Sequence, residues 1–338
     1  MENGNALDGL VGGHDRSSHV LGLFPRWHTS SRGGDCNQTR LWDIASGQRL
    51  WGGGDCFLSI IYTLAFSPDG LRLAGGNTYG STVGNAATGE GDVLSLERHK
   101  TVSTVFSPDG TKLARAVHIN PEEYDPLMGY ARILDASNYA VLHTLTGHSN
   151  HVYSVDFSPD GQLLLTTSLD GTARLWNVSD GSLVRVVEGG GGVFGKFSAD
   201  GKTFFTCAGI GTVDFLYDTG TLKFWRTSDG ALLARFDNLG AGPIAVSPAG
   251  KYFAYGTGGA LVVAYIPLWI ETITRTNNEI TLRWQGGSGL YQVQARPHLD
   301  KGAWHSHGPP TTNTTFTHTT RSHLFYRVQS LPNPLKGS

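Results

Sequence analysis

Residues 146–184 read TGHSNHVYSVDFSPDGQLLLTTSLDGTARLWNVSDGSLV and contain the features that decide the fold. Two short runs, VYSVDF and LLLTTS, flank the turn sequence Ser-Pro-Asp-Gly at 158–161. In such a turn Pro fixes φ, Asp hydrogen-bonds its own backbone and Gly closes the turn without strain. A run carrying Trp176, a second turn at Asp180-Gly181 and another apolar run follow. The segment therefore predicts four short antiparallel strands.

The Ser-Pro-Asp-Gly turn recurs through much of the chain. Copies or near copies lie at 67–70, 107–110, 158–161, 198–201 and 247–250. Their intervals of 40, 51, 40 and 49 residues indicate one repeating unit with insertions. Tandem units of four strands, with no helical pattern between them, predict an all-β fold of the β-propeller type in which each unit forms one blade.

Residues 146–184 resemble a nearly complete WD40 repeat. The resemblance is carried by Gly147-His148, by the Ser-Pro-Asp-Gly turn, and by Trp176-Asn177 in place of the Trp-Asp pair of the family. It implies the WD40 type of β-propeller, a fold that serves many proteins as an interaction platform.

Other parts of the chain carry weaker copies of the same repeat. The segment TRLWDIASGQRL has the unmodified pair Trp42-Asp43, and LKFWRTSDGALL at 222–233 is a looser copy. The resemblance covers roughly residues 5–270.

In this family a His, a Ser or Thr, an Asp and the Trp form a structural hydrogen-bond chain within a blade. By position, the resemblance assigns these roles to His148, Ser168, Asp170 and Trp176. The other units are incomplete, because one has His99 with Leu134 at the Trp position and another has Trp225 without the His.

Six blades can be traced, at about 11–50, 51–97, 98–145, 146–187, 188–236 and 237–270. The sixth has only three strand patterns. Residues 5–10, NALDGL, resemble an outer strand, so the N-terminus is expected to supply the fourth strand and close the ring. Rings of seven blades are commoner in this family, and the alternative is a truncated seven with a blade upstream of Met1.

The first unit departs from the repeat where its turn should be. Phe24 stands as far before Trp42 as Ser158 stands before Trp176, and Phe-Pro-Arg-Trp replaces Ser-Pro-Asp-Gly there. If the codons are read one base late, the same DNA can encode Ser-Pro-Asp-Gly-Thr-Leu-Leu-Ala. We therefore hypothesise that residues from about 15 to about 36 are translated in a displaced frame, the alternative being a diverged blade. In both cases the first blade is expected to pack less well than its neighbours.

Two units carry insertions between their second and third strands, at 118–130 and about 208–220. Both insertions would emerge on the same face of the ring, and both combine aromatic with acidic residues. Such a composition is typical of protein interfaces. The candidate partner-binding residues are Tyr124, Asp125, Met128, Tyr130, Phe215 and Tyr217. The alternative is that these are solvated loops whose aromatic side chains fold back on the ring.

The sequence changes character after Trp269. Residues 279–332 have no blade signature but alternate in strand fashion, which predicts a small antiparallel β-sandwich. The segments ITLRW, GLYQVQ and FYRVQS, with Trp304, resemble the short fibronectin-III-like modules at the C-terminal ends of secreted bacterial proteins. The expected organisation is a propeller over 1–270 and the sandwich with its tail over 271–338. Trp284, Tyr291 and Trp304 are expected in the core of the sandwich.

No catalytic, metal or cofactor motif is found. A formal net charge of −2 gives no electrostatic footprint for nucleic acid, and no apolar run approaches the length of a membrane span. The three cysteines lie at unrelated spacings, so neither a disulfide framework nor a thiolate metal site is indicated. His298, His305 and His307 are interpreted as surface residues rather than metal ligands.

The sequence thus predicts a monomeric, non-catalytic scaffold that presents loops of the propeller face to a protein or peptide, without cofactor, nucleic acid or membrane insertion. The alternative function is an extracytoplasmic propeller hydrolase or glycan-binding protein. The localisation stays open, since the C-terminal module favours export while the sequence at Met1 shows no signal peptide.

Overall fold

A computed structural model describes residues 21–24, 27–32, 38–43, 49–52, 61–78, 80–88, 91–93, 99–118, 129–209, 220–239, 244–246, 252–257, 260–265, 269–276, 279–285, 290–296, 303–319 and 325–330. Every regular element in these ranges is a β-strand, which confirms the all-β class. None of the described residues form a helix of the length and apolarity needed to cross a membrane.

Five antiparallel sheets have four strands each, and within each sheet the strands neighbour one another in chain order. The first contains β1 (Leu21–Phe24), β2 (Trp27–Arg32), β3 (Gln38–Asp43) and β4 (Arg49–Gly52). The second contains β5 (Ile61–Phe66), β6 (Arg72–Asn77), β7 (Gly80–Asn85) and β8 (Gly91–Val93). The third contains β9 (Lys100–Phe106), β10 (Lys112–His118), β11 (Gly129–Asp135) and β12 (Val141–Leu145). The fourth contains β13 (Val152–Phe157), β14 (Leu163–Ser168), β15 (Thr172–Asn177) and β16 (Leu183–Glu188). The fifth contains β17 (Phe194–Phe197), β18 (Thr203–Gly209), β19 (Gly220–Arg226) and β20 (Leu232–Leu239).

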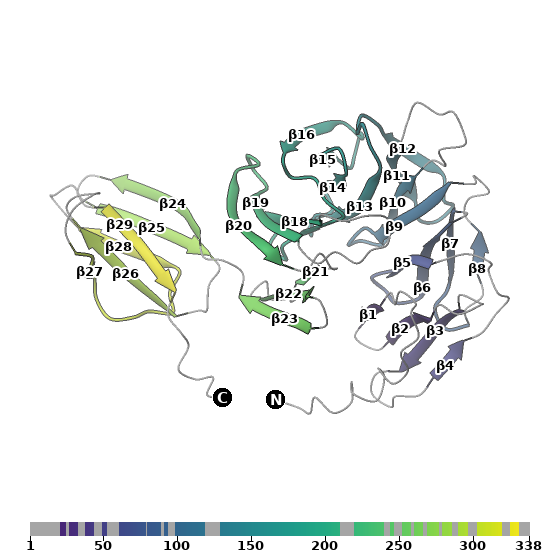
Figure 1. Cartoon of the computed structure of the whole chain (residues 1–338), viewed down its shortest axis with the longest axis horizontal. Coiled ribbons are helices and arrows are strands. Elements are labelled where there is room, and N and C mark those ends of the chain that lie inside the picture. Colours follow the sequence, from purple (N-terminus) through teal and green to yellow (C-terminus); the bar gives the residue numbers. More distant parts are fainter. Residues whose placement is uncertain are drawn as a thin grey trace.

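A three-stranded sheet follows, with β21 (Ile244–Val246), β22 (Tyr252–Thr257) and β23 (Ala260–Tyr265). Figure 1 shows these sheets arranged one after another along an arc, with β5, β9 and β13 towards its inside and β8, β12 and β16 towards its outside. Such sheets are those expected of a WD40-type propeller. Residues 5–10, which were expected to close the ring, lie outside the described residues.

The Ser-Pro-Asp-Gly turn links the first and second strands of its sheet through side-chain hydrogen bonds. The Ser158 hydroxyl donates to Asp160 Oδ1 at 2.6 Å and accepts from the amide of Leu163 at 2.9 Å. Gly161 closes the turn with φ of 70°, a conformation that glycine adopts without strain. The copies at Ser67, Ser107 and Ser198 make the same bonds.

These turns also lie close to one another at one rim of the neighbouring sheets. A Cβ atom at Gly201 would lie 3.3 Å from Cδ of Pro159, which belongs to the turn of the preceding sheet. Gly161 meets Pro108, and Gly110 meets Pro68, in the same way. The successive turns therefore stand side by side, and the opposite strand ends form a second rim.

The innermost strands are linked by hydrogen bonds between sheets. The carboxylate of Asp156, on β13, accepts a hydrogen bond from the amide of Phe197 on β17 at 2.8 Å. Its other oxygen accepts from the ammonium of Lys196 at 3.1 Å. Similar amide-to-hydroxyl bonds join the earlier sheets, from Thr104 to Thr63 and from Val155 to Ser103. The sheets thus form a connected framework and are not independent hairpins.

We expect the substitution Asp156→Ala to lower the free energy of unfolding by about 2 kcal/mol, because it leaves the buried amide of Phe197 without an acceptor. Urea denaturation of the wild type and the variant measures this change. The matched control is Lys196→Met, which removes only the half-exposed ammonium and is expected to cost less than about 1 kcal/mol. Equal losses in the two variants would contradict the role given to the amide bond.

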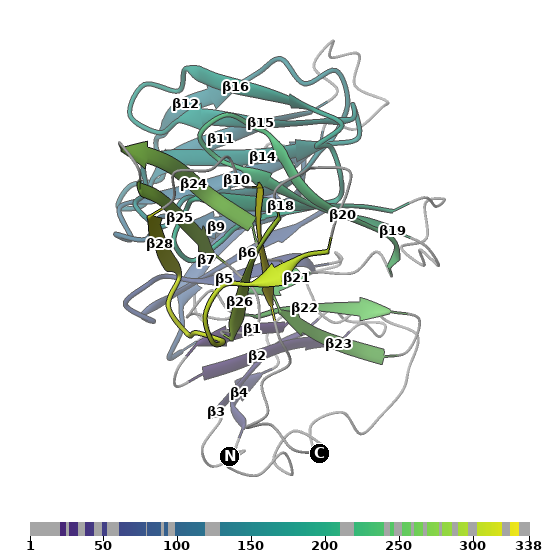
Figure 2. The ribbon, with the colours of Figure 1, turned by 90° about the vertical axis from the view of Figure 1, so that its left-hand side faces the viewer.

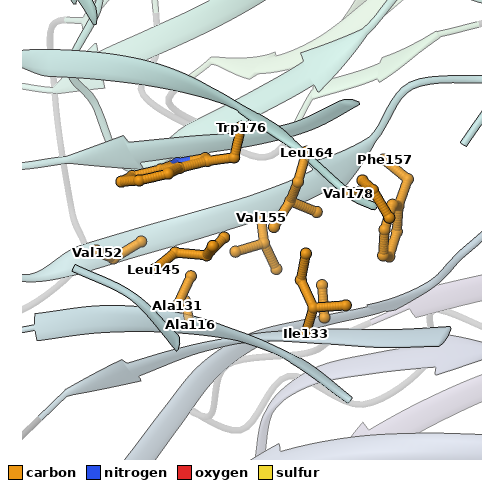
Figure 3. Close-up of a cluster of buried hydrophobic side chains, with 11 residues drawn as sticks. Ala116, Ala131, Ile133, Leu145, Val152, Val155, Phe157, Leu164, Trp176 and Val178 are labelled. Atoms are coloured by element: carbon orange, nitrogen blue, oxygen red, sulfur yellow. The ribbon is translucent and has the colours of Figure 1, made fainter. Parts of the chain in front are cut away.

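Buried side chains fill the spaces between adjacent sheets. One cluster combines Ala131 and Ile133 of β11 with Val155 of β13 and Trp176 of β15 (Figure 3). Leu164 faces this cluster, whereas its neighbour Leu165 faces a second cluster shared with the next sheet. Because successive strand residues point to opposite faces, each central strand packs against both neighbouring sheets.

The first sheet differs from the others at its first turn. Phe24 pairs with Trp27, so only two residues connect β1 to β2. The five-residue stretches 67–71, 107–111, 158–162, 198–202 and 247–251 make the corresponding connection in the later sheets. His28 pairs with Trp42 in this sheet. With the regular five-residue turn, the residue two positions later in β2 would pair with Trp42, so the register of β2 differs by two residues from that of a sheet encoded by the displaced frame. The side chains of β1–β4 are not described, so the expectation that the first blade packs less well stays a prediction.

We expect the encoding DNA to contain a compensating pair of insertions or deletions that bracket codons from about 15 to about 36. The short first turn is a property of the translated residues and is the same for a displaced frame and for a diverged blade. Sequencing of the genomic DNA and of the transcript across this region would detect such a pair of insertions or deletions. An uninterrupted frame, with the same protein sequence in independent isolates, would contradict it and make the altered turn a genuine feature of the protein.

Two further sheets lie in the C-terminal part of the chain, to one side of the arc in Figure 1 and in front of it in Figure 2, which is viewed from that side. One contains β24 (Trp269–Thr276), β25 (Glu279–Gln285) and β28 (Thr315–Thr319), and the other contains β26 (Tyr291–Arg296), β27 (His305–Ser306) and β29 (Phe325–Ser330). Leu282 and Trp284 of the first sheet share a buried cluster with Tyr291 and Val293 of the second. The expected boundary between 270 and 271 falls within β24, which pairs with β25.

Candidate functional site

A buried hydrogen-bond chain crosses the fourth sheet from Trp176 to Asp170. The indole Nε1–H of Trp176 donates to Thr166 Oγ1 at 2.9 Å, and Thr166 Oγ1 lies 2.8 Å from His148 Nε2. The other nitrogen of His148, Nδ1, lies 2.7 Å from Asp170 Oδ2. The chain joins the segment before β13 to β14, β15 and the turn between them.

The donors and acceptors fix the direction of this chain. An indole can only donate, so the hydroxyl hydrogen of Thr166 points to Nε2 of His148, and Nδ1–H points to the carboxylate. Burial lowers the pKa of His148, and the bond with Asp170 offsets this only in part. Burial alone would raise the pKa of Asp170, but hydrogen bonds from Thr172 and His148 bring it below its ordinary value. At neutral pH the pair is therefore neutral imidazole and carboxylate.

Ser168, which the sequence pattern placed in this chain, is not part of it. Its hydroxyl donates to the carbonyl of Asn150 at 3.1 Å and accepts from the amide of Asp170 at 3.1 Å. The register explains the correction, because Trp176 lies opposite Leu164, and Ser168 is four residues, or about 13 Å, farther along the strand. Thr166 is the diagonal neighbour of Trp176 and lies within reach of its ring.

The order hydroxyl, imidazole, carboxylate also occurs in hydrolase triads. Here the Thr166 side chain is completely buried, and its oxygen is occupied by the Trp176 indole. The His148 side chain is 1% exposed, so no substrate reaches either group. This hydrogen-bond chain therefore links strands and does not supply an accessible nucleophile.

Other described sheets contain only parts of this hydrogen-bond chain. In the fifth, Trp225 Nε1 donates to Thr206 Oγ1 at 3.0 Å, with no His beside them among the described residues. In the third, Leu134 takes the Trp position opposite Leu113, and His99 lies 3.3 Å from the hydroxyl of Tyr130 instead. In the first, the pair Trp42-Asp43 ends β3, where only its backbone is described.

The two insertions lie between the predicted strands but are shorter than predicted, over 119–128 and 210–219. One runs from His118 at the end of β10 to Gly129, and the other from Gly209 to Gly220. The candidate residues Tyr124, Asp125, Met128, Phe215 and Tyr217 lie outside the described residues. Both insertions leave their sheets at the end opposite the Ser-Pro-Asp-Gly turns.

Tyr130 is not an exposed loop residue. It lies in β11, is 4% exposed and packs against Val117. The guanidinium of Arg132 lies 4.9 Å from the centre of its ring. Because β11 already begins at Gly129, Tyr130 points into the space between sheets, and the prediction that it lies on a binding loop is wrong.

A group that sequence reasoning missed lies at the root of the first insertion. We call it the strand-start cluster, and its members are Tyr62, Lys100, His118, His151 and Tyr153. The ring of His118 stacks on His151 at 4.5 Å and meets the edge of Tyr153 at 4.6 Å. The ammonium of Lys100 lies 4.0 Å from the ring centre of Tyr62. His118 is buried and the other four are half-buried.

His118 is held as a neutral imidazole. Burial, with the nearby His151 and Lys100, lowers its pKa to about 3, although a bond to the carbonyl of Val152 at 2.7 Å acts in the opposite direction. A carbonyl only accepts, so Nε2 carries the hydrogen. The cluster therefore contains one permanent cation, Lys100, among aromatic rings.

A sequence signal for this cluster exists in the repeat itself. Lys100 and His151 each precede the phenylalanine before a Ser-Pro-Asp-Gly turn by six residues, while Tyr62 and Tyr153 precede it by four. Residues in equivalent positions of adjacent units lie near one another where their sheets pack side by side. An alignment of the units by their turns would have brought these positions together.

The C-terminal sheets bury Trp284 and Tyr291, as expected of core residues, and leave Trp304 half-buried under Arg327. His305 is exposed, whereas the ring of His307 lies 4.1 Å from that of His318. No group of three or more potential metal ligands occurs among the described residues. Cys207 is buried, which raises the pKa of its thiol to about 11.

Comparison with known proteins finds similarity to proteins that contain WD repeats. The family described as WD domain, G-beta repeat (WD40) matches residues 139–177. The chain is 34% identical over 150 residues to WD repeat-containing protein SL1-17 of Schistosoma mansoni, covering 44% of this chain and 46% of that protein. It is also 34% identical over 158 residues to SEC12-like protein 1 of Arabidopsis thaliana, covering 45% and 36%.

A shorter match joins the chain to the U3 small nucleolar RNA-associated protein 21 homolog of Schizosaccharomyces pombe, with 45% identity over 53 residues, 16% of this chain and 6% of that protein. The aligned part spans less than half the length of each of these relatives. Together the matches support a WD40-repeat protein. These relatives are eukaryotic, and they give no support to the resemblance of the C-terminal part to fibronectin-III-like modules of bacterial proteins.

Proposed function

We propose that this WD40-repeat protein is a non-catalytic scaffold that binds a protein or peptide on the rim opposite its Ser-Pro-Asp-Gly turns. The observation that carries the proposal is the contrast between the two rims. Proline-glycine contacts join the turns of adjacent sheets, whereas the opposite rim carries both insertions and the strand-start cluster. A rigid framework with one variable, chemically diverse rim is well suited to recognition.

The architecture that we propose for this scaffold is a ring of six blades over 1–270, with residues 5–10 as the outer strand of the last blade. The two C-terminal sheets share one buried cluster and are proposed to form a fibronectin-III-like β-sandwich over 271–338. The protein would act as a monomer without cofactor.

The relatives support a role of this general kind. Proteins with WD repeats typically act through protein partners, and one relative is named as a U3 small nucleolar RNA-associated protein homolog. The buried state of Thr166 and His148 argues against the alternative of a hydrolase that uses this triad-like group.

A thermal-shift screen separates the scaffold from a hydrolase or glycan-binding protein. We expect a random peptide pool to raise the melting temperature of the purified chain, and a glycan panel and divalent cations to leave it unchanged. Stabilisation by glycans or cations, with none by peptides, would contradict the proposal.

The insertions can be tested in the same assay. We expect the double variant Tyr124→Ala and Phe215→Ala to weaken peptide capture without lowering the melting temperature, because interface aromatics contribute affinity and not core packing. The matched control is Tyr130→Phe, which changes a buried ring and is expected to leave capture unchanged. Full capture by the double variant would remove the insertions from the binding surface.

A further inference from the structure

We propose that the strand-start cluster binds an acidic segment of the partner, with the ammonium of Lys100 pairing with a glutamate or aspartate carboxylate between the rings of Tyr62 and Tyr153. The inference rests on the proposed scaffold function and adds the chemistry of the partner to it.

The cluster is assembled by the sheets and not by one local segment. Tyr62 lies on β5, Lys100 on β9 and His118 on β10, while Tyr153 lies on β13 and His151 immediately precedes that strand. Strand β9 lies beside both β5 and β13, which brings the start of three innermost strands together (Figure 1). Its members keep fixed positions because the bonds between innermost strands hold those strands in register.

The strand-start cluster carries the positive charge of Lys100 and has no negatively charged member. Within the described part of the chain Lys100 makes no ion pair, and its recorded contact is the face of the Tyr62 ring. The charged groups that act on the pKa of His118 are His151 and Lys100, and both oppose its protonation. A ligand carboxylate would pair with this ammonium, and pairing beside an aromatic ring is stronger than pairing in open water.

His151 has hydrogen-bonding capacity that the described residues do not use. Its Nδ1 is buried and without a hydrogen-bond partner in that part of the chain. A buried polar nitrogen in this state costs free energy. The imidazole ring as a whole is half-buried and stacks on His118, so it borders the site proposed at Lys100.

The same features select a short acidic peptide over a polyanion. With a formal net charge of −2, the chain lacks the excess of basic residues that binds the many phosphates of a nucleic acid. One lysine pairs with one or two carboxylates, and the tyrosine rings offer apolar contact to the neighbouring peptide atoms. The partner segment therefore combines glutamate or aspartate with at least one apolar or aromatic residue.

Fluorescence anisotropy of the full chain with a short labelled peptide rich in glutamate and tyrosine tests this inference. The matched probe has glutamine in place of every glutamate. We expect the glutamate peptide to bind about tenfold more tightly at low salt and to lose most of this advantage at high salt.

Lys100→Met is expected to abolish the difference between the two peptides, and His151→Ala to reduce it. The matched control is Lys112→Met, at the opposite end of the strand that carries His118, which is expected to leave the difference intact. Lys100→Gln is the second variant should Lys100→Met not fold, and each variant is checked by its melting temperature.

Equal affinity for the two peptides, tighter binding of a lysine peptide, or displacement of the glutamate peptide by a single-stranded oligonucleotide would each overturn the inference. If the random peptide pool stabilises the protein but the acidic probe does not bind, the inference fails and the scaffold function stands. If no peptide stabilises the protein, the proposed function itself fails.

Discussion

Replacing His148 with alanine is expected to lower the free energy of unfolding by about 3–5 kcal/mol. The substitution leaves the buried carboxylate of Asp170 without its imidazole partner and the hydroxyl of Thr166 without an acceptor. Removing one member of a buried, hydrogen-bonded pair costs this much because the remaining group stays buried and unpaired. Urea denaturation followed by tryptophan fluorescence measures the loss.

Two variants make this result specific to the hydrogen-bond chain. His143→Ala removes a half-buried imidazole whose recorded hydrogen bond is to the carbonyl of Ser179. We expect this substitution to lower the free energy of unfolding by less than about 1 kcal/mol. Trp176→Phe keeps a ring in the core but removes the indole donor, with an expected cost of about 1–2 kcal/mol. Equal losses for His148→Ala and His143→Ala would show that the chain does not stabilise the fold.

Acidification is expected to destabilise the protein between pH 6.5 and pH 4, with His118 as a main cause. The pKa of this imidazole is about 3 in the folded chain, whereas an unfolded histidine titrates near 6.5. Within this window the unfolded state binds the proton and the folded state does not. Stability is therefore complete above the unfolded pKa and is lost as the pH falls, at up to about 1.4 kcal/mol per pH unit.

His118→Gln tests this contribution, because glutamine keeps a donor for the carbonyl of Val152 but does not titrate. We expect its free energy of unfolding to fall less steeply with decreasing pH than that of the wild type. Contributions from His148 and from the aspartates of the turns are common to both proteins and cancel in the comparison. Parallel curves for the two proteins would contradict the lowered pKa of His118.

The repeat made much of the fold predictable. The Ser-Pro-Asp-Gly turn combines a fixed φ, a local hydrogen bond and a glycine at φ near 70°, so it specifies its hairpin almost without tertiary help. Alternation such as Leu164 and Leu165 then fixes which face meets which neighbour. These are local properties, and local properties can be recognised in one sequence.

The candidate site was less predictable because it depends on register and on contacts between units. Ser168 and Thr166 are both hydroxyl residues on one strand, and only the pairing of Leu164 with Trp176 selects Thr166. Tyr130 was assigned to a loop because the sequence does not show that β11 begins at Gly129. His118 and His151 are far apart in sequence, and their rings stack only when adjacent sheets pack.

Hydrogen–deuterium exchange with and without a bound library peptide tests the central claim of a peptide-binding rim most directly. The account predicts slower exchange on binding at the first residues of β9 and β13 and the last residues of β10, with the Ser-Pro-Asp-Gly turns unchanged. Protection confined to those turns or to the C-terminal sheets, or no protection anywhere, would contradict the account.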